Sequence, residues 1–513
     1  MMNLSTLKTL FLTTVFMLFG CLAIQAADEG LITKQITIKL DKAGTLPDRI
    51  SSSKKYLITN LKIVGEVNGT DWRLIREMAG SNHGLGKTDG KLSILDLSDA
   101  KIVKGGLPYV ARLDNEQYTS NDELGDYAFY GCSGLTSLTL PSSVTSIGSY
   151  AFYGCSGLAS LTLPSSVTSI GWYAFEDCSG LTSFTLPSSV TSIGYRAFYG
   201  CSGLTSLTIP SSVTLIGESA FAGCCGLTSL TILPGVTSIG YGAFDGCSGL
   251  TSLTLPSSVT SIGSYAFYGC SGLTILTLPS SVTSIGYRAF DGCSGLTSLT
   301  IPSSVTSIGY KAFAYCSGLT ILTIPSSVTS IGDEAFAYCR GLTSLTLPSS
   351  VTSIGDEAFA YCSGLTILTL PSSVTSIGES AFKGCSGLTS LTIPSGITSI
   401  GSYAFYGCSG LTSIYVYLEK TPKLGKDIFK ECDAKICTVY VPTGTYDDYF
   451  VSEFGYFENI VEFDATGIDK VTTSTDAKEL SRYSVNGQRL SAPAKGLNIV
   501  KYSDGSVKKV AVQ

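Results

Sequence analysis

The chain has 513 residues and a net charge of −6 at pH 7; 44% of its residues are hydrophobic and only 14% are charged. Nucleic-acid binding needs clustered Lys and Arg that displace counterions, and this composition argues against it. The length would suit several ordinary domains, but a 23-residue repeat that recurs thirteen times indicates one repeat array with two ends.

Residues 1–26 resemble a secretory signal peptide. They carry one Lys, then an apolar run, then small residues, and the run is too short for a membrane span. We favour cleavage after Ala26; the alternative is a lipoprotein signal in which Cys21 of "LFGC" becomes the lipid anchor. In both cases we expect a secreted or outer-surface protein with no transmembrane segment in the mature chain.

Residues 27–125 follow the apolar frame of the repeats only loosely. Two degenerate L-x-x-L-x-L frames lie on either side of an expected longer helix, at Ile58, Leu61 and Ile63 and at Leu92, Leu95 and Leu97. A repeat array needs a cap that covers its open edge. We therefore expect residues 27–125 to be an irregular N-terminal cap.

Each repeat in residues 126–410 contains a short strand. In "LTSLTLPSSVTSIG" the apolar side chains are Leu135, Leu138, Leu140, Val144 and Ile147. The central S-L-T-L alternates with period two and is stopped by a proline, which predicts a strand followed by a turn.

The rest of the repeat, "GSYAFYGCSG", suggests a helical turn. Ala151, Phe152 and Cys155 lie at i, i+1 and i+4, on one face of a single turn bounded by glycines. One such coil cannot bury enough apolar surface alone, so strands of successive coils must pair in parallel, about 4.8 Å apart. We predict an α/β solenoid: a right-handed, thirteen-coil array with a parallel sheet on one face and short helical turns on the other.

The repeat wording, I-G-x-x-A-F-x-x-C-x-x-L-x-x-L-x-L-P, resembles the BspA-like subclass of bacterial leucine-rich repeats over about 285 residues. The resemblance implies a surface-displayed or extracellular protein, often an adhesin for host matrix or plasma proteins or for neighbouring cells. It does not identify the ligand.

The C-terminal part leaves the repeat consensus. Residues 411–465 form the expected C-terminal cap, in which "CTVYVPTGTYDDYF" is a last degenerate coil. Residues 466–513 contain a linker and two expected β-hairpins, with turns at Asn486-Gly487 and Asp504-Gly505. This segment resembles the C-terminal sorting domains of type IX secretion cargo; the alternative is a plain β accessory module.

Seventeen cysteines in an exported chain raise the question of disulfides. Thirteen of them recur every 23 residues, from Cys132 to Cys408, on the face of Ala and Phe. Since identical sites cannot all pair, and a buried thiol behaves as a small apolar group, we expect a core ladder. Cys432 and Cys437 are the better disulfide candidates, and the sequence leaves their pairing open.

We expect no enzymatic activity and no cofactor. The chain has one histidine, His83, and its repeated serines lie in no nucleophile frame. Asp333, Glu334, Asp356, Glu357 and Glu379 would stack on adjacent coils, but acids at the start of a turn are explained more simply by its N–H groups. We predict no metal site and keep a weak cation site there as the alternative.

Two surfaces are candidates for ligand binding. Three isoleucines replace a consensus serine on every second coil and lie beside outward threonines, in the set Ile275, Ile321, Ile367, Thr277, Thr323 and Thr369. Aromatic residues follow the I-G pair of several repeats, above all Tyr150, Trp172, Tyr173 and Tyr195. Tyrosine offers contact area at little cost in rotamer entropy, although these rings can also simply shield the core.

The sequence therefore predicts a monomeric binding scaffold outside the cell, an adhesin for an extracellular protein or glycan. The alternatives are a purely structural surface protein and a physical surface binder, because twelve outward threonines from Thr139 to Thr392 resemble the arrays of ice-binding solenoids.

Overall fold

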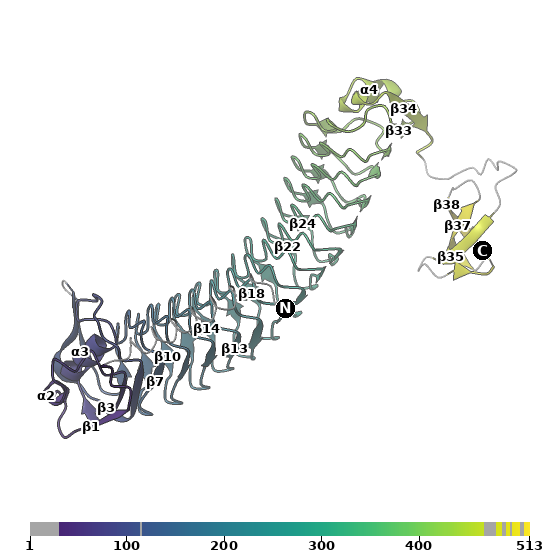
Figure 1. Cartoon of the computed structure of the whole chain (residues 1–513). Helices are drawn as coiled ribbons and strands as arrows, with labels where there is room; N and C mark the ends of the chain where they lie inside the picture. The colour runs from purple at the N-terminus through teal and green to yellow at the C-terminus, as the bar shows by residue number, and fades with distance from the viewer. Residues whose placement is uncertain are drawn as a thin grey trace, which may run out of the picture. The chain divides into compact units, whose positions relative to one another are not determined.

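The computed structural model describes residues 30–112, 115–465, 479–484, 489–492, 495–502 and 507–512. The chain divides into two units, Met1–Phe463 and Asp464–Gln513. The first unit holds the repeat array, whose coils follow one another side by side in Figure 1. The expected signal peptide and the linker at 466–478 lie outside the described residues.

The predicted strand of each repeat is confirmed. Strand β7 (Ser137–Thr139) pairs in parallel with β9 (Ser160–Thr162), and Leu138 lies opposite Leu161, one repeat further on. We call this rank of strands the S-L-T ladder. Its further members are β11 (Ser183–Thr185), β13 (Ser206–Ile209), β15 (Ser229–Ile232), β17 (Ser252–Thr254), β19 (Ile275–Thr277), β21 (Ser298–Thr300), β23 (Ile321–Thr323), β25 (Ser344–Thr346), β27 (Ile367–Thr369), β29 (Ser390–Ile393) and β31 (Ser413–Val416).

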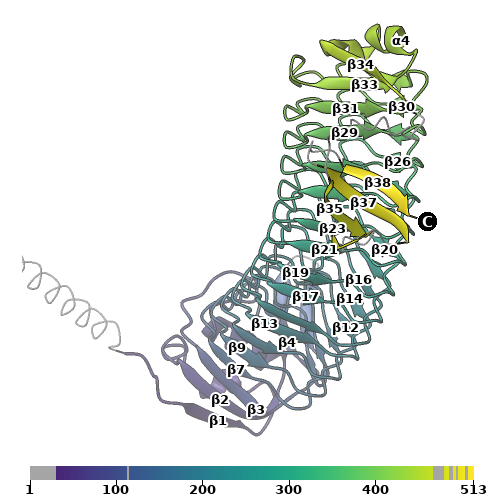
Figure 2. The same ribbon diagram turned by 90° about the vertical axis from the view of Figure 1, so that its right-hand side faces the viewer.

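A second rank of parallel strands, which the sequence analysis did not predict, runs beside the first (Figure 2). We call it the S-I ladder, because nearly every member is a Ser-Ile pair such as Ser169–Ile170, which lies opposite Ser192–Ile193. Its members are β6 (Glu123–Leu124), β8 (Ser146–Ile147), β10 (Ser169–Ile170), β12 (Ser192–Ile193), β14 (Leu215–Ile216), β16 (Ser238–Ile239), β18 (Ser261–Ile262), β20 (Ser284–Ile285), β22 (Ser307–Ile308), β24 (Ser330–Ile331), β26 (Ser353–Ile354), β28 (Ser376–Ile377), β30 (Ser399–Ile400) and β32 (Lys423–Leu424).

The predicted helical turn was wrong. Between I-G and the cysteine the backbone forms successive tight turns, with left-handed φ angles of 58° at Tyr150 and 68° at Gly154. A right-handed helix cannot contain such residues. Instead, the N–H groups of Tyr150 and Phe152 donate to the carbonyls of Trp172 and Ala174 in the next coil, at 2.8 and 2.7 Å. Each coil is therefore hydrogen-bonded to its neighbours on three sides.

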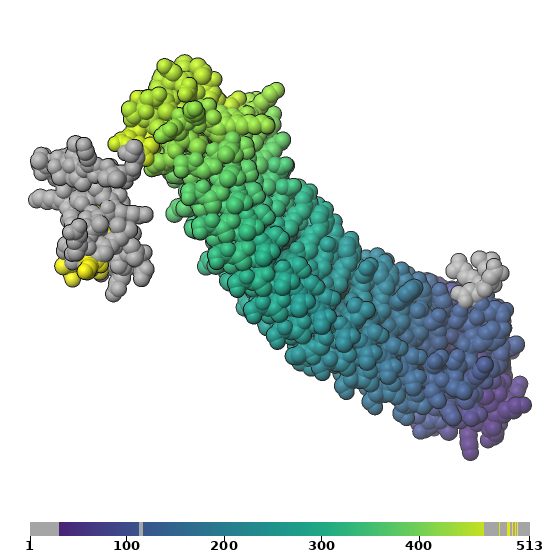
Figure 3. All heavy atoms as spheres, turned by 180° about the vertical axis from the view of Figure 1, so that it is seen from behind, coloured from purple at the N-terminus to yellow at the C-terminus, as the bar shows by residue number. Residues whose placement is uncertain are grey.

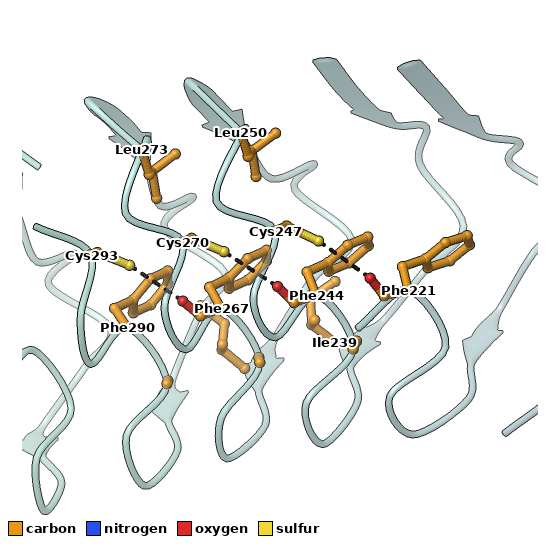
Figure 4. Close-up of a cluster of buried hydrophobic side chains, with 14 of the residues drawn as sticks. Phe221, Ile239, Phe244, Cys247, Leu250, Phe267, Cys270, Leu273, Phe290 and Cys293 are labelled. Carbon is orange, nitrogen blue, oxygen red and sulfur yellow. Dashed lines mark hydrogen bonds between the residues drawn. The ribbon is translucent and has the colours of Figure 1, made fainter. Parts of the chain in front are cut away.

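The expected core is confirmed. Ala151, Phe152 and Cys155 are fully buried, as are the leucines that precede each strand of the S-L-T ladder. The Phe rings stack from coil to coil, for example Phe244 on Phe267 with centroids 5.4 Å apart. Each of the thirteen regularly spaced cysteines beyond the first donates its thiol to a phenylalanine carbonyl 26 residues earlier, as Cys270 does to Phe244 at 3.3 Å (Figure 4). The cysteines thus fill the core and also satisfy a backbone acceptor.

The N-terminal residues continue the S-L-T ladder. Strands β1 (Ile36–Leu40), β2 (Asn60–Val67) and β3 (Ile94–Ile102) precede β7 in the same parallel sheet. The expected helix is α3 (Gly69–Met78), after the short α2 (Leu46–Arg49). An antiparallel pair, β4 (Gly105–Arg112) with β5 (Asn115–Thr119), completes this region.

Side chains of this region end the array by replacing donors of a missing coil. Within the array, the carbonyls of Ser149 and Ala151 accept hydrogen bonds from backbone N–H groups of the preceding coil. The equivalent carbonyls in the first coil, those of Asp126 and Ala128, have no preceding coil of this kind. In the first coil they accept from the Tyr109 hydroxyl at 2.7 Å and the Trp72 indole at 3.0 Å. These two bonds satisfy the carbonyls of Asp126 and Ala128 at the junction.

The C-terminal end of the array adds coils of another kind. Strand β33 (Thr438–Pro442) pairs with β31 and then with β34 (Asn459–Phe463), and α4 (Tyr446–Phe450) and η1 (Glu453–Tyr456) lie between them. Cys432 continues the thiol ladder by donating to the Phe405 carbonyl at 3.4 Å. Cys432 and Cys437 are both free thiols, as is each cysteine among the described residues. The disulfide that the sequence left open is therefore not formed in this structure.

The second unit is a small antiparallel sheet in the order β36-β35-β37-β38. Its strands are β35 (Glu479–Ser484), β36 (Arg489–Leu490), β37 (Gly496–Tyr502) and β38 (Val507–Val512). The strands on either side of each expected hairpin turn pair with one another. The turns at Asn486-Gly487 and Asp504-Gly505 themselves lie outside the described residues.

Candidate functional site

A groove of about 810 Å³ lies at the I-G corner of four consecutive coils. Its lining includes the four aromatic residues singled out from the sequence, together with an exposed leucine and an acidic residue: Tyr150, Trp172, Tyr173, Tyr195, Leu215 and Glu218. We call it the aromatic groove. The structure thus brings the predicted aromatic set into one concave surface.

The groove exists because glycine cannot be replaced at the corner of each coil. A Cβ atom on Gly171 or Gly194 would lie only 2.6 Å from a backbone carbonyl carbon of the preceding coil. Close stacking of the coils therefore requires glycine, and this leaves the floor of the groove without side chains. Figure 3 shows how closely the coils follow one another on the surface.

Two wall residues are departures from the repeat. Trp172 is 63% exposed at a position where the other coils carry Ser, Tyr, Glu or Asp. Leu215 is 58% exposed and replaces a serine that all other array repeats keep in V-T-S-I-G. Leu215 was not predicted from the sequence, although this single departure from the repeat was a visible signal. Both changes place large apolar side chains in solvent, which packing of the coil does not require.

The tyrosine rings of the groove are held by one another. Tyr150 and Tyr173 stack with centroids 4.6 Å apart and planes 12° apart, whereas Tyr195 meets Tyr173 edge-on at 80°. Burial among these rings raises the pKa of Tyr150 to about 12. The Tyr150 phenol therefore remains a neutral hydrogen-bond donor at physiological pH.

One cation lies beside the groove: the Arg196 guanidinium is 5.7 Å from the centroid of the Tyr195 ring, which belongs to the lining. Arg196 lies over the Tyr199 ring at 4.3 Å, and its guanidinium is 3.9 Å from the buried carboxylate of Glu176. Burial raises the pKa of Glu176, and Arg196 opposes that shift. None of the residues that line the groove is Lys or Arg.

The isoleucine stripe lies on the other ladder. Ile275, Ile321 and Ile367 are 60–62% exposed on β19, β23 and β27, with Thr277, Thr323 and Thr369 exposed beside them. Serines of the intervening coils separate the isoleucines, because Ser298 and Ser344 lie directly opposite Ile321 and Ile367. The two candidate surfaces are therefore not parts of one site.

The stacked acids have a structural role. The Asp333 carboxylate accepts a hydrogen bond from the Asp356 backbone N–H at 2.9 Å, and Asp356 accepts from that of Glu379 at 2.7 Å. They line a second groove of about 650 Å³ at the same corner of later coils. Among the described residues, no cluster of three or more His, Cys, Asp and Glu side chains is arranged to hold a metal ion. The acids thus join one coil to the next.

Other polar side chains that were candidates for a chemical role also make structural contacts. His83 lies 3.0 Å from the Arg73 guanidinium. The second serine of "PSSV" donates to the preceding coil, as Ser166 does to the Val144 carbonyl at 2.5 Å.

In the described part of the chain, no helix is both long and apolar enough to cross a bilayer.

Residues 122–251, 237–366 and 329–449 match the family model described as the BspA type leucine rich repeat region, which comprises six copies. These matches span more than half of the chain. The chain belongs to the BspA-type leucine-rich repeat family. No curated protein matches it.

Three solved structures illustrate the likeness. A leucine-rich repeat protein from Bacteroides ovatus ATCC 8483 is 32% identical over 68% of this chain and 89% of its own, with a TM-score of 0.59. A leucine rich cell surface protein from Faecalibacterium prausnitzii A2-165 is 29% identical over 68% and 85%, with a TM-score of 0.36. The pneumococcal vaccine antigen PcpA is 23% identical over 64% and 85%, with a TM-score of 0.35. The Bacteroides structure supports the stacked-coil fold of the BspA-type array.

Proposed function

We propose that this BspA-type protein is a non-enzymatic binding scaffold outside the cell, an adhesin that holds an extracellular protein or glycan. The observation that carries the proposal is the aromatic groove. Its walls combine exposed aromatic and aliphatic side chains with a few polar groups, which is the usual composition of ligand-binding sites.

The repeats supply an internal reference for this argument. A surface residue that serves only the fold is expected to match its equivalents in other coils, since each coil makes the same contacts. Leu215 replaces a serine that the other array repeats keep, Trp172 is the one tryptophan at a position that otherwise carries Ser, Tyr, Glu or Asp, and both line the same groove. Two independent departures that converge on one concavity favour a ligand site over drift of the repeats.

Export and attachment belong to the same proposal. The signal-like residues 1–26 would direct the chain out of the cytoplasm, with cleavage after Ala26 or lipid attachment at Cys21. The C-terminal β module, from its resemblance to type IX sorting domains, would place the protein on the outer surface. We further propose that the array is monomeric and that its partners include host matrix or plasma proteins.

The test is capture of extracellular proteins and glycans by the full mature chain and by two variants. The groove variant combines Trp172→Ser and Leu215→Ser; the stripe variant combines Ile275→Ser, Ile321→Ser and Ile367→Ser. Every substitution restores a residue found at the same position in other coils, so the fold should persist. A ligand whose affinity falls at least tenfold in the groove variant, and not in the stripe variant, supports the proposal. Loss in the stripe variant alone would move the site to the S-L-T ladder.

A further inference from the structure

We propose that the aromatic groove binds a neutral, unbranched polysaccharide whose sugar rings lie along the array. The inference rests on the proposed function and names the ligand class of the same site. It follows from the free indole of Trp172, the repetition of the groove from coil to coil, and the chemistry of its lining.

Trp172 presents an unoccupied aromatic face. Its side chain is 63% exposed, and within the described part of the chain no other ring is stacked on it, unlike the tyrosines beside it. A pyranose ring carries C–H groups on its flat faces, and these pack well on an indole, while the indole N–H remains available to a hydroxyl. The groove therefore offers a platform for a sugar ring.

The groove repeats in one direction. Its floor includes the I-G backbone of three successive coils, with Gly171, Gly194 and Gly217 in equivalent places. Neighbouring coils are about 4.8 Å apart because their strands are hydrogen-bonded. A ligand that uses this surface repeatedly must itself repeat along the array, as an extended chain of sugar rings does.

The lining favours a neutral ligand rich in hydroxyl groups. Ser149, Ser192 and the tyrosine hydroxyls can both donate and accept hydrogen bonds, as sugar hydroxyls do. The charged residue in the lining is Glu218, and no Lys or Arg is present to neutralise a carboxylate or sulfate group. An acidic polysaccharide is therefore disfavoured.

An extended peptide is also disfavoured. Peptides that dock on sheets usually add a strand to a free edge, where backbone groups are unpaired. Here β10 pairs with β8 and β12, and β12 pairs with β10 and β14. The strands beneath the groove therefore have no free edge to offer.

The first experiment is native gel electrophoresis of the full mature chain in gels that contain a soluble polysaccharide. The probes are hydroxyethyl cellulose, a β-mannan, a xylan and a mixed-linkage β-glucan, with polygalacturonate as the acidic comparison. We expect at least one neutral polymer to retard the chain, and polygalacturonate not to do so. Trp172→Ser should weaken the retardation at least tenfold. Tyr287→Ser, at the position equivalent to Trp172 in a later coil outside the groove, is the matched control and should leave it unchanged.

A second readout reports directly on the groove. The chain has two tryptophans, of which Trp72 is buried and Trp172 is exposed. A bound polysaccharide should shift the emission to the blue and protect it from acrylamide quenching. Both effects should disappear in Trp172→Ser, whose remaining emission comes from Trp72.

The outcomes separate this inference from the proposed function. No retardation by any neutral polymer, equal retardation of wild type and Trp172→Ser, or retardation by polygalacturonate alone would overturn the polysaccharide assignment. If, in addition, a protein ligand protects Trp172 from quenching, the binding scaffold stands and its ligand is a protein. If neither class of ligand affects Trp172 while the stripe variant loses capture, both the groove assignment and this inference fail.

Discussion

The thiol of Cys270 donates a hydrogen bond to the carbonyl oxygen of Phe244, 3.3 Å away in the preceding coil. Burial raises the pKa of Cys270 to about 12, so the thiol is protonated at neutral pH. Because the thiolate is the reactive form, the whole ladder should be inert in the folded chain.

A thiol titration tests this. Cys225, which replaces a serine of the consensus, is the exposed cysteine of the described residues. We expect Ellman's reagent to modify one cysteine rapidly in the native mature chain and the remainder only in denaturant. Cys225→Ser should abolish the rapid phase; rapid labelling of several further thiols would contradict a closed core.

The glycine of each C-S-G segment should be required for stability only where a preceding coil packs against it. A Cβ on Gly157 would come within 2.3 Å of the Ser133 carbonyl oxygen, whereas a Cβ on Gly134, in the first repeat, meets nothing within 4 Å. We expect Gly157→Ala to lower the free energy of unfolding by about 1–3 kcal/mol, in line with overpacked cores. Gly134→Ala is the control and should be neutral in chemical denaturation.

Asp291 should make stability depend on pH. The carboxyl is buried 3.5 Å from Arg288, and burial raises its pKa from 3.8 to about 6, against the opposing effect of Arg288 and Lys311. The folded state therefore favours the protonated form of Asp291. The contribution of this carboxyl to the stability of the fold is fully present below pH 4 and is lost as the pH rises through 6. Asp291→Asn should raise the free energy of unfolding at pH 7.5 by about 1–3 kcal/mol, at 1.4 kcal/mol per pKa unit, and should change it little at pH 4. Equal effects at both pH values would refute the assignment.

The N-terminal junction should depend on the Tyr109 hydroxyl. Tyr109→Phe removes the donor to the partly buried Asp126 carbonyl, and losing the partner of a buried acceptor typically costs about 1–3 kcal/mol, which is the upper range here. Tyr118→Phe, at an exposed phenol of the same region, is the matched control. Hydrogen exchange should show faster exchange in residues 126–132 of Tyr109→Phe, and no such change in Tyr118→Phe.

The sequence predicted those features of the fold that depend on periodicity. Leu138 and Cys155 recur every 23 residues, so their inward direction, and the parallel pairing of successive strands, follow from the repeat and from apolar spacing alone. The apparent helical spacing of Ala151, Phe152 and Cys155 was misleading. Left-handed residues such as Tyr150 occur in the same segment, and a tyrosine gives no sequence signal for a positive φ.

The candidate site was predictable only in part. Variation among repeats identified Tyr150 and Trp172 as surface positions. The groove between them depends on how closely Gly171 approaches the preceding coil, which is a property of the stack and not of one repeat. Leu215 belongs to the same concavity through stacking, although it lies 43 residues beyond Trp172.

The uniform hydrogen bonding between coils has a consequence for inheritance. Almost identical coding segments recombine and slip readily, and such events delete or add repeats as whole units. Because each coil presents the same donors and acceptors to the next, a deletion of 23 residues anywhere among the regular coils recreates a junction already present elsewhere. A chain that lost or gained 23 residues among the regular coils should therefore keep both ends intact and change only the length of the surface that the array presents.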